Sequence, residues 1–306
     1  MGEPVAQNTV FGWVLSGRTK SQTMEDSTSP VHVHHMQIAE DLSGLMSRFW
    51  EIEEIPRSSP TSEEDVRCEE HFRKTHSRTP GGQYVVRLPL KSPSPIDIGD
   101  TRARAQRCLL SLEKRLSSRP DERESYMQFL AEYEELGHMR LAPAREHNSP
   151  CVYLPHHSIV KASSSTTKTR IVFNASAVST NGRSLNELQM TGPKLQSDLS
   201  LVHTQWRTHR FVYSADIAKM YRQILIDTRD IDLQRILWRR SPAEAINEYQ
   251  LRTVTYGTAS APFLALRVLK QLADDEGGSF PLGKRALLTS MYIDDALFGA
   301  DSVPQI

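Results

Sequence analysis

Residues 290–302 read SMYIDDALFGADS, and this stretch places two carboxylates, Asp294 and Asp295, side by side inside an apolar and aromatic run. Two carboxylate charges about 4 Å apart repel each other by roughly 4 kcal/mol at an effective dielectric constant near 20. A fold tolerates that repulsion if the pair is solvated on an exposed turn, shares a proton or binds a divalent cation. The pattern over residues 284–302 predicts a strand, a turn carrying the two aspartates, and a second strand.

A third carboxylate stands in a similar setting. Asp216 directly follows the apolar run FVYSA at residues 211–215, and we expect the chain to turn helical after it. Two strand ends that each offer carboxylates can converge across a sheet and hold two Mg²⁺ ions, which prefer oxygen ligands. Two such ions activate a 3′-hydroxyl and stabilise the leaving pyrophosphate in nucleotidyl transfer.

The rest of the chain predicts a mixed α+β fold. Short β-rich runs predict strands in residues 81–90, 151–161, 167–176, 233–240 and 249–257, of which 151–161 and 167–176 form a hairpin. Adjacent His156 and His157 would point to opposite sides of a strand, so we expect packing or surface positions for them rather than metal ligation.

Helical periodicity marks three further segments, residues 100–120, 121–137 and 259–277. We expect Asp100 and Ser260 to cap the first and third of these helices. The residues expected to be buried are Ala105, Leu109, Leu112 and Leu116 in the first segment, Met127, Leu130, Tyr133 and Leu136 in the second, and Phe263, Leu266, Leu269 and Leu272 in the third.

The formal net charge is zero, but it is unevenly distributed. Residues 1–150 hold 19 Lys and Arg against 23 Asp and Glu, residues 151–240 hold 13 against 6, and residues 241–306 hold 5 against 8. The middle segment is therefore the candidate surface for a polyanion, although a solvated basic face has the same composition. No apolar run approaches the roughly 18 residues of a membrane span, and the chain shows no secretory signal, so we expect an intracellular, cytoplasmic protein.

Several longer blocks of sequence point to one family. They are TKTRIVFNAS (167–176), ADIAKMYRQI (215–224), QRILWR (234–239), TVTYGTASAPFLA (253–265) and YIDDALFGADS (292–302). In this order and spacing they closely resemble the reverse transcriptase of Pao/BEL-type LTR retrotransposon polyproteins, over about residues 66–306. The resemblance implies an α+β fold of fingers and palm, in which the palm is a mixed or antiparallel sheet packed on helices. A thumb follows in this family, and we expect it to be absent from residues 1–306.

The resemblance also implies site residues. Asp216, Asp294 and Asp295 are the catalytic, metal-binding carboxylates for two Mg²⁺ or Mn²⁺ ions, with Asp216 and Asp294 as main ligands and Asp295 in a supporting role. Tyr292 and Ile293 complete the Y-x-D-D motif.

The resemblance assigns nucleotide binding to another group of residues. Lys168 and Arg170 on the fingers hairpin match the cations that grip the triphosphate. Tyr221 matches the steric gate that rejects a ribose 2′-hydroxyl, although by itself it reads as a packed tyrosine. Tyr256 and Gly257 match the lining of the nucleotide pocket, and Pro262 opens the helix that follows.

Four segments are expected along the chain. Residues 1–20 resemble the end of a retropepsin-like protease, without the Asp-Thr/Ser-Gly triplet of such an enzyme anywhere in the chain. Residues 21–65 are expected to be a partly disordered linker and residues 66–150 a helical N-terminal extension. Residues 151–306 are expected to be fingers and palm that stop after the YIDD hairpin.

Three functions stay open. The first is an RNA-directed DNA polymerase that acts on dNTPs and an RNA or DNA template-primer, beside protease, RNase H and integrase segments. The second is a truncated, catalytically inactive remnant that at most binds nucleic acid or a partner. The third is a non-enzymatic metal-binding domain. The three aspartates favour the first function, whereas an end eleven residues after Asp295, with no thumb, favours the second.

Overall fold

The computed structural model describes residues 5–9, 12–16, 61–92, 96–144, 150–160 and 169–302. The chain forms two compact units, Met1–Ser59 and Pro60–Ile306. In the first unit, β1 (Val5–Thr9) and β2 (Gly12–Ser16) form an antiparallel hairpin. Most of the expected linker, residues 21–60, lies outside the described residues.

The second unit has a mixed α/β fold, which confirms the predicted class. Its described residues contain six α-helices, which are α2 (Glu63–Thr75), α3 (Arg102–Ser117), α4 (Pro120–Glu135), α5 (Leu199–Arg207), α6 (Ala261–Glu276) and α7 (Pro281–Thr289). Within the described part of the chain, no helix combines the length and apolarity needed to cross a membrane.

The described strands of this unit form small sheets. One sheet orders β3 (Ser77–Arg78), β4 (Tyr84–Val86) and β9 (Leu225–Ile226), and a second orders β10 (Arg235–Trp238), β11 (Asn247–Leu251) and β5 (Met139–Leu141). A third orders β12 (Met291–Tyr292), β13 (Asp295–Ala300) and β8 (Phe211–Asp216). The predicted hairpin is present as β6 (His156–Val160) and β7 (Thr169–Phe173). All pairs are antiparallel except β4 with β9.

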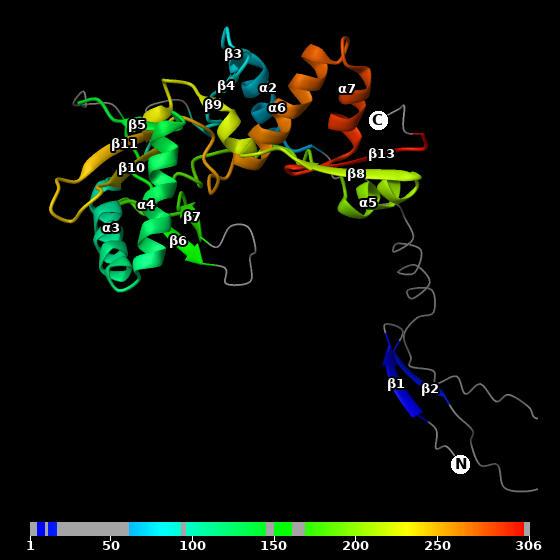
Figure 1. Ribbon diagram of the computed structural model, residues 1–306, viewed down its shortest axis with the longest axis horizontal. Coiled ribbons are helices and arrows are strands. Elements are labelled where there is room, and N and C mark those ends of the chain that lie inside the picture. Colours follow the sequence, from blue (N-terminus) through cyan, green and yellow to red (C-terminus); the bar gives the residue numbers. More distant parts are fainter. Residues whose placement is uncertain are drawn as a thin grey trace, which may run out of the picture. The chain divides into compact units, whose positions relative to one another are not determined.

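Helices α3 and α4 pack on each other and on the β6–β7 hairpin (Figure 1). The four residues predicted to be buried in α3 are its buried residues. The carboxylate of Asp100 accepts the backbone N–H groups of Arg102 and Ala103 at 3.1 and 3.3 Å, although Thr101 holds the N-cap position. Asp100 therefore supplies the predicted cap from one residue further back.

The buried face of α4 differs from the prediction. Leu130 and Tyr133 are buried, but Leu136 is 49% exposed and Tyr126 is fully buried instead. Both sets have helical spacing, and the packing partners decide between them. The Tyr126 ring lies 5.4 Å from the Trp238 ring of β10, between centroids, so contacts with the sheet turn this face of α4 inward.

Two helices correct the sequence-based prediction. Residues 281–289, whose C-terminal part was predicted to be a strand, form α7, which starts at Pro281 and contains Ala and Leu, both strong helix formers. Helix α2 begins at Glu63, inside the expected linker, after a capping box in which Ser62 and Asp65 bond each other's backbone N–H at 3.1 Å. Glu69 of α2 pairs with the buried Arg267 of α6 at 2.9 Å.

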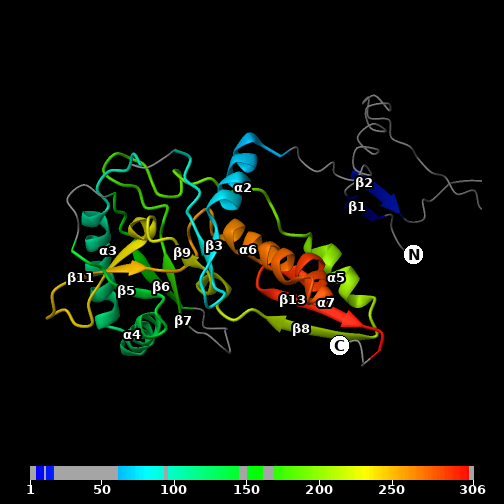
Figure 2. The same ribbon diagram turned by 90° about the horizontal axis from the view of Figure 1, so that it is seen from above.

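Helix α6 is buried on more of its surface than predicted. Phe263 and Leu269 are buried, and Leu266 and Leu272 pack partly buried against the same core. The Ser260 hydroxyl makes no cap and donates instead to the Gln189 Oε1 atom at 2.8 Å. Helix α6 also packs on α7, and α5 and α7 both pack against β12 and β13. Figure 2 shows α5 and α7 beside β13. These helices support the sheet that carries the three aspartates.

Candidate carboxylate site

The strand pair β8–β13 brings two of the three aspartates together. In its antiparallel register Asp216 is the direct partner of Asp295, and Tyr213 is the partner of Phe298. Direct partners in an antiparallel pair project from the same face of the sheet, so the two carboxylates share one face. Both side chains are exposed. The Tyr213 and Phe298 rings stack 5.9 Å apart and reinforce the register.

Asp294 lies in the two-residue turn between β12 and β13. Its neighbour Ile293 has φ 56°, a left-handed conformation that costs a β-branched residue about 1–2 kcal/mol. The Asp294 carbonyl accepts the backbone N–H of Ile217 at 2.8 Å, which ties the turn to the residue after Asp216. Such strain persists only where neighbouring contacts hold it, and it is typical of functional sites.

The strained turn has a second support. The side-chain amide of Gln196 accepts the Ile293 N–H at 2.8 Å and donates to the Met291 carbonyl at 3.0 Å. Sequence reasoning did not single out Gln196, because a lone amide in a loop carries no local signal. Tyr292, of the predicted motif, pairs with Asp295 across the hairpin.

The three carboxylates do not yet form a closed metal site. Within the described part of the chain, no group of three or more His, Cys, Asp or Glu side chains is arranged to hold a metal ion. The structure therefore places Asp216 and Asp295 across from each other and Asp294 on the adjoining turn.

Tyr221 lies close to this group. It belongs to the short 3-10 helix η1 (Met220–Gln223), which follows β8, and it is half-buried. Burial, and next the negative charge of Asp294, raise the pKa of the Tyr221 hydroxyl. The flanking cations Lys219 and Arg222 both pair with Glu132 of α4, which holds η1 against that helix.

The other predicted nucleotide residues lie around strand β7. Arg170 is exposed on β7, and the Tyr256 ring lies 5.5 Å from the Phe173 ring of the same strand. Burial raises the pKa of Tyr256, whereas a hydrogen bond with Tyr133 and the charge of Arg170 act against that rise. Pro262 is exposed in the first turn of α6, and Lys168 lies outside the described residues.

At Gly257, the packing of neighbouring backbone leaves no room for a side chain. Its φ is +101°, and a Cβ would lie 2.2 Å from the backbone carbonyl oxygen of Phe173. Among the described residues, no hydrogen bond, ion pair or ring contact links Arg170, Tyr256 or Gly257 to the three aspartates. The structure therefore shows two groups of predicted site residues, one at β8–β13 and one at β7.

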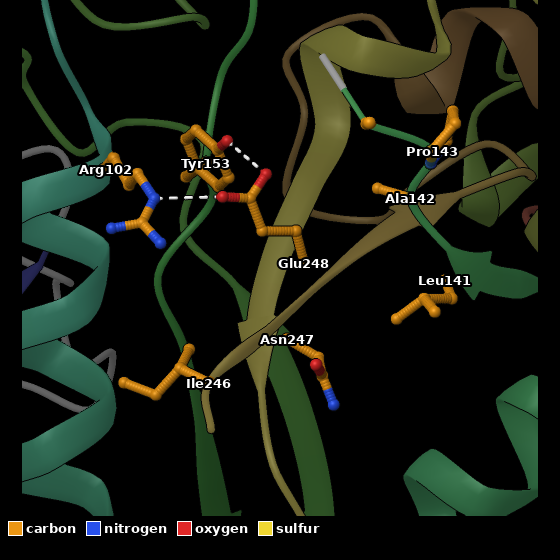
Figure 3. A pocket seen from close by; sticks show the side chains of 9 residues that line it. Arg102, Leu141, Ala142, Pro143, Tyr153, Ile246, Asn247 and Glu248 are labelled. Atoms are coloured by element: carbon orange, nitrogen blue, oxygen red, sulfur yellow. Dashed lines mark hydrogen bonds and ion pairs between the residues drawn. The ribbon is translucent and has the colours of Figure 1, made fainter.

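A pocket of about 590 Å³ lies elsewhere, between the start of α3 and strands β5 and β11 (Figure 3). On the wall of this pocket, the Glu248 carboxylate accepts hydrogen bonds from the Arg102 guanidinium at 3.0 Å and from the Tyr153 hydroxyl at 2.5 Å. Burial raises the pKa of Glu248, but hydrogen bonds from Tyr153, Arg102 and Arg235 lower it below the ordinary value. None of the predicted site residues lines this pocket, and its charged groups are paired with each other.

A comparison with models of known protein families finds no match to this chain, and neither does a comparison with curated proteins. Function is therefore inferred from the residues and their geometry.

Proposed function

We propose that the chain carries the fingers and palm of an RNA-directed DNA polymerase of the Pao/BEL retrotransposon type. One observation carries the proposal: Asp216 at the end of β8 pairs with Asp295 at the start of β13, beside the strained turn that bears Asp294. The substrates are dNTPs and an RNA or DNA template-primer inside the cell. The chain belongs to a polyprotein that also contains protease, RNase H and integrase segments.

The donor set fits Mg²⁺ or Mn²⁺. Mg²⁺ usually keeps several waters and binds through one or two carboxylates plus substrate phosphates, so Asp216, Asp294 and Asp295 provide enough oxygen ligands. When bound, two such ions activate the primer 3′-hydroxyl and neutralise charge on the leaving pyrophosphate. Asp216, Asp294 and Asp295 would hold these ions at the end of the β8–β13 pair.

The remaining residues select and orient the nucleotide. The Tyr221 ring, beside Asp294, excludes a ribose 2′-hydroxyl. Lys168 and Arg170 bind the triphosphate, because guanidinium and ammonium groups pair strongly with phosphate oxygens. The Tyr256 ring packs against Phe173 of β7.

A second candidate is a catalytically inactive protein that binds nucleic acid through its basic middle segment. Two observations favour it: the excess of 13 Lys and Arg over 6 Asp and Glu in residues 151–240, and the open arrangement of the carboxylates among the described residues. Binding of this kind weakens steeply with salt and needs no divalent cation.

Primer extension on an RNA template separates the two candidates. We expect wild type to extend the primer with Mg²⁺ or Mn²⁺, and Asp294→Asn to lower the rate at least about a hundredfold, because a catalytic metal supplies several kcal/mol. Asp274→Asn is the matched control, since Asp274 is an exposed carboxylate on α6 whose ion-pair partner is Lys284. Extension at equal rates by wild type and Asp294→Asn contradicts the metal role. Salt-sensitive RNA binding with no extension by wild type favours the second candidate.

A further inference from the structure

Gln196 makes two hydrogen bonds to the turn that carries Asp294. Its Oε1 atom accepts the Ile293 N–H at 2.8 Å, and its Nε2 atom donates to the Met291 carbonyl at 3.0 Å. The two backbone groups lie on either side of Tyr292, so one amide spans the end of β12 and the first residue of the turn. A side-chain amide is suited to this task because it offers a donor and an acceptor together, which no carboxylate or ammonium group does.

The turn needs such a support at this point. Ile293 is left-handed at φ 56°, and within the described residues the only other left-handed residue that is not glycine is Lys219. The β12–β13 ladder pairs Met291 with Ala296 and Tyr292 with Asp295 and does not extend into the turn. The Gln196 amide therefore bonds the N–H of the strained residue itself.

Gln196 lies three residues before the start of helix α5. Asp198, two residues later, caps α5 by accepting the Ser200 N–H at 3.2 Å. The helix packs against β12 and β13, and its Trp206 indole N–H donates to the Tyr213 carbonyl of β8 at 3.0 Å. Gln196 is thus anchored to the same sheet whose turn it supports.

We propose that Gln196 is a positioning residue that holds the Ile293–Asp294 turn in its strained conformation and so orients the Asp294 carboxylate for a divalent cation. The role of the cation in this inference rests on the proposed function, whereas the hydrogen bonds of Gln196 are observed independently of it. The Asp294 carbonyl accepts the Ile217 N–H, so the turn that Gln196 supports is joined directly to the residue after Asp216.

Gln196→Met in the full chain tests the inference, because Met keeps the length of the side chain and loses the hydrogen bonds to Ile293 and Met291, together with a longer one to the neighbouring Ser197 carbonyl at 3.3 Å. Gln205→Met on α5 is the control, since the Gln205 side chain makes no hydrogen bond within the described residues. One readout is amide hydrogen exchange in residues 291–295, and the other is Mn²⁺ affinity measured by electron paramagnetic resonance.

We expect Gln196→Met to speed exchange of the Ile293 amide roughly tenfold, as the loss of a net hydrogen bond predicts, and to weaken Mn²⁺ binding several-fold. Gln205→Met should change neither. Gln196→Glu keeps the acceptor and loses the donor, so it should leave the Ile293 amide protected.

Four outcomes overturn the inference. If the Ile293 amide exchanges at the wild-type rate in Gln196→Met, or fast in Gln196→Glu, the Gln196 hydrogen bonds do not support the turn. If Gln196→Met exchanges faster but binds Mn²⁺ as tightly as wild type, Gln196 supports the turn but does not position Asp294 for the cation. If the wild-type protein binds no Mn²⁺, the proposed function is refuted as well. This outcome is distinguished from the others because it is measured on wild type alone.

Discussion

Gly257 and Ile293 both hold a positive φ, but different neighbours impose it. At Ile293, the Gln196 amide and the Asp294–Ile217 backbone bond hold a residue in a conformation that its branched side chain disfavours. At Gly257, the backbone of Phe173 fills the place of a side chain. Packing alone thus explains Gly257, and its role beside a nucleotide stays a prediction.

We predict that Gly257→Ala lowers the free energy of unfolding by about 1–3 kcal/mol, because its Cβ meets the Phe173 carbonyl oxygen and its φ is +101°. Urea denaturation followed by tryptophan fluorescence measures the change. Gly278→Ala is the control, since a Cβ there meets nothing within 4 Å. A Gly257→Ala variant as stable as this control would contradict the contact.

At the scale of single elements, helix ends explain where α2 and α4 begin. Helix α2 starts with the capping box of Ser62 and Asp65 and carries Glu63, Glu64 and Asp65 in its first turn, which suits the helix dipole. Helix α4 starts at Pro120, which has no N–H to lose there. Both signals are local, yet the prediction uses neither: residues 121–137 are predicted to be helical from their periodicity, and α2 is not predicted as a separate helix.

We predict that Ser62→Ala lowers the free energy of unfolding by about 1 kcal/mol, because the Asp65 N–H loses its side-chain acceptor at the start of α2. Thermal unfolding followed by circular dichroism measures the loss. In the control Ser125→Ala, the lost hydroxyl bonds only the Asp121 carbonyl within α4, so we expect little change or a slight gain. Equal stability of wild type and Ser62→Ala would show that the capping box contributes nothing.

At the scale of the whole second unit, His156 joins three elements. Its Nε2–H donates to the Leu237 carbonyl of β10 at 2.9 Å, so its Nδ1 is the acceptor for the Tyr126 hydroxyl of α4, while His156 itself lies on β6. Complete burial lowers the pKa of His156 to about 4. Both histidines take positions of the predicted kinds, since His156 is buried in packing and His157 is exposed on the surface.

This burial predicts a pH dependence of stability. As pH falls from 6.5 to 4, the unfolded chain binds a proton at His156 and the folded protein does not. The free energy of unfolding should therefore fall with decreasing pH, by on the order of 3 kcal/mol in total from this residue. Urea denaturation at a series of pH values should show a flatter dependence for His156→Gln, which removes the titrating group. Parallel curves for the two proteins would exclude His156 as the source.

The sequence by itself determined what depends on neighbouring residues. It predicted the buried face of α3, the β6–β7 hairpin and the mixed class of the fold, because helical and strand periodicities are local properties. It also named the three aspartates, because carboxylates in an apolar run stand out without a structure.

Only the tertiary structure decided which face of α4 is buried, because two helical stripes compete and the β10 contact with Tyr126 selects one. It also decided that Asp216 lies opposite Asp295, since strand register joins residues far apart in the chain. The support of Ile293 by Gln196 was beyond the sequence for the same reason: a hydrogen bond across 97 residues leaves no local pattern.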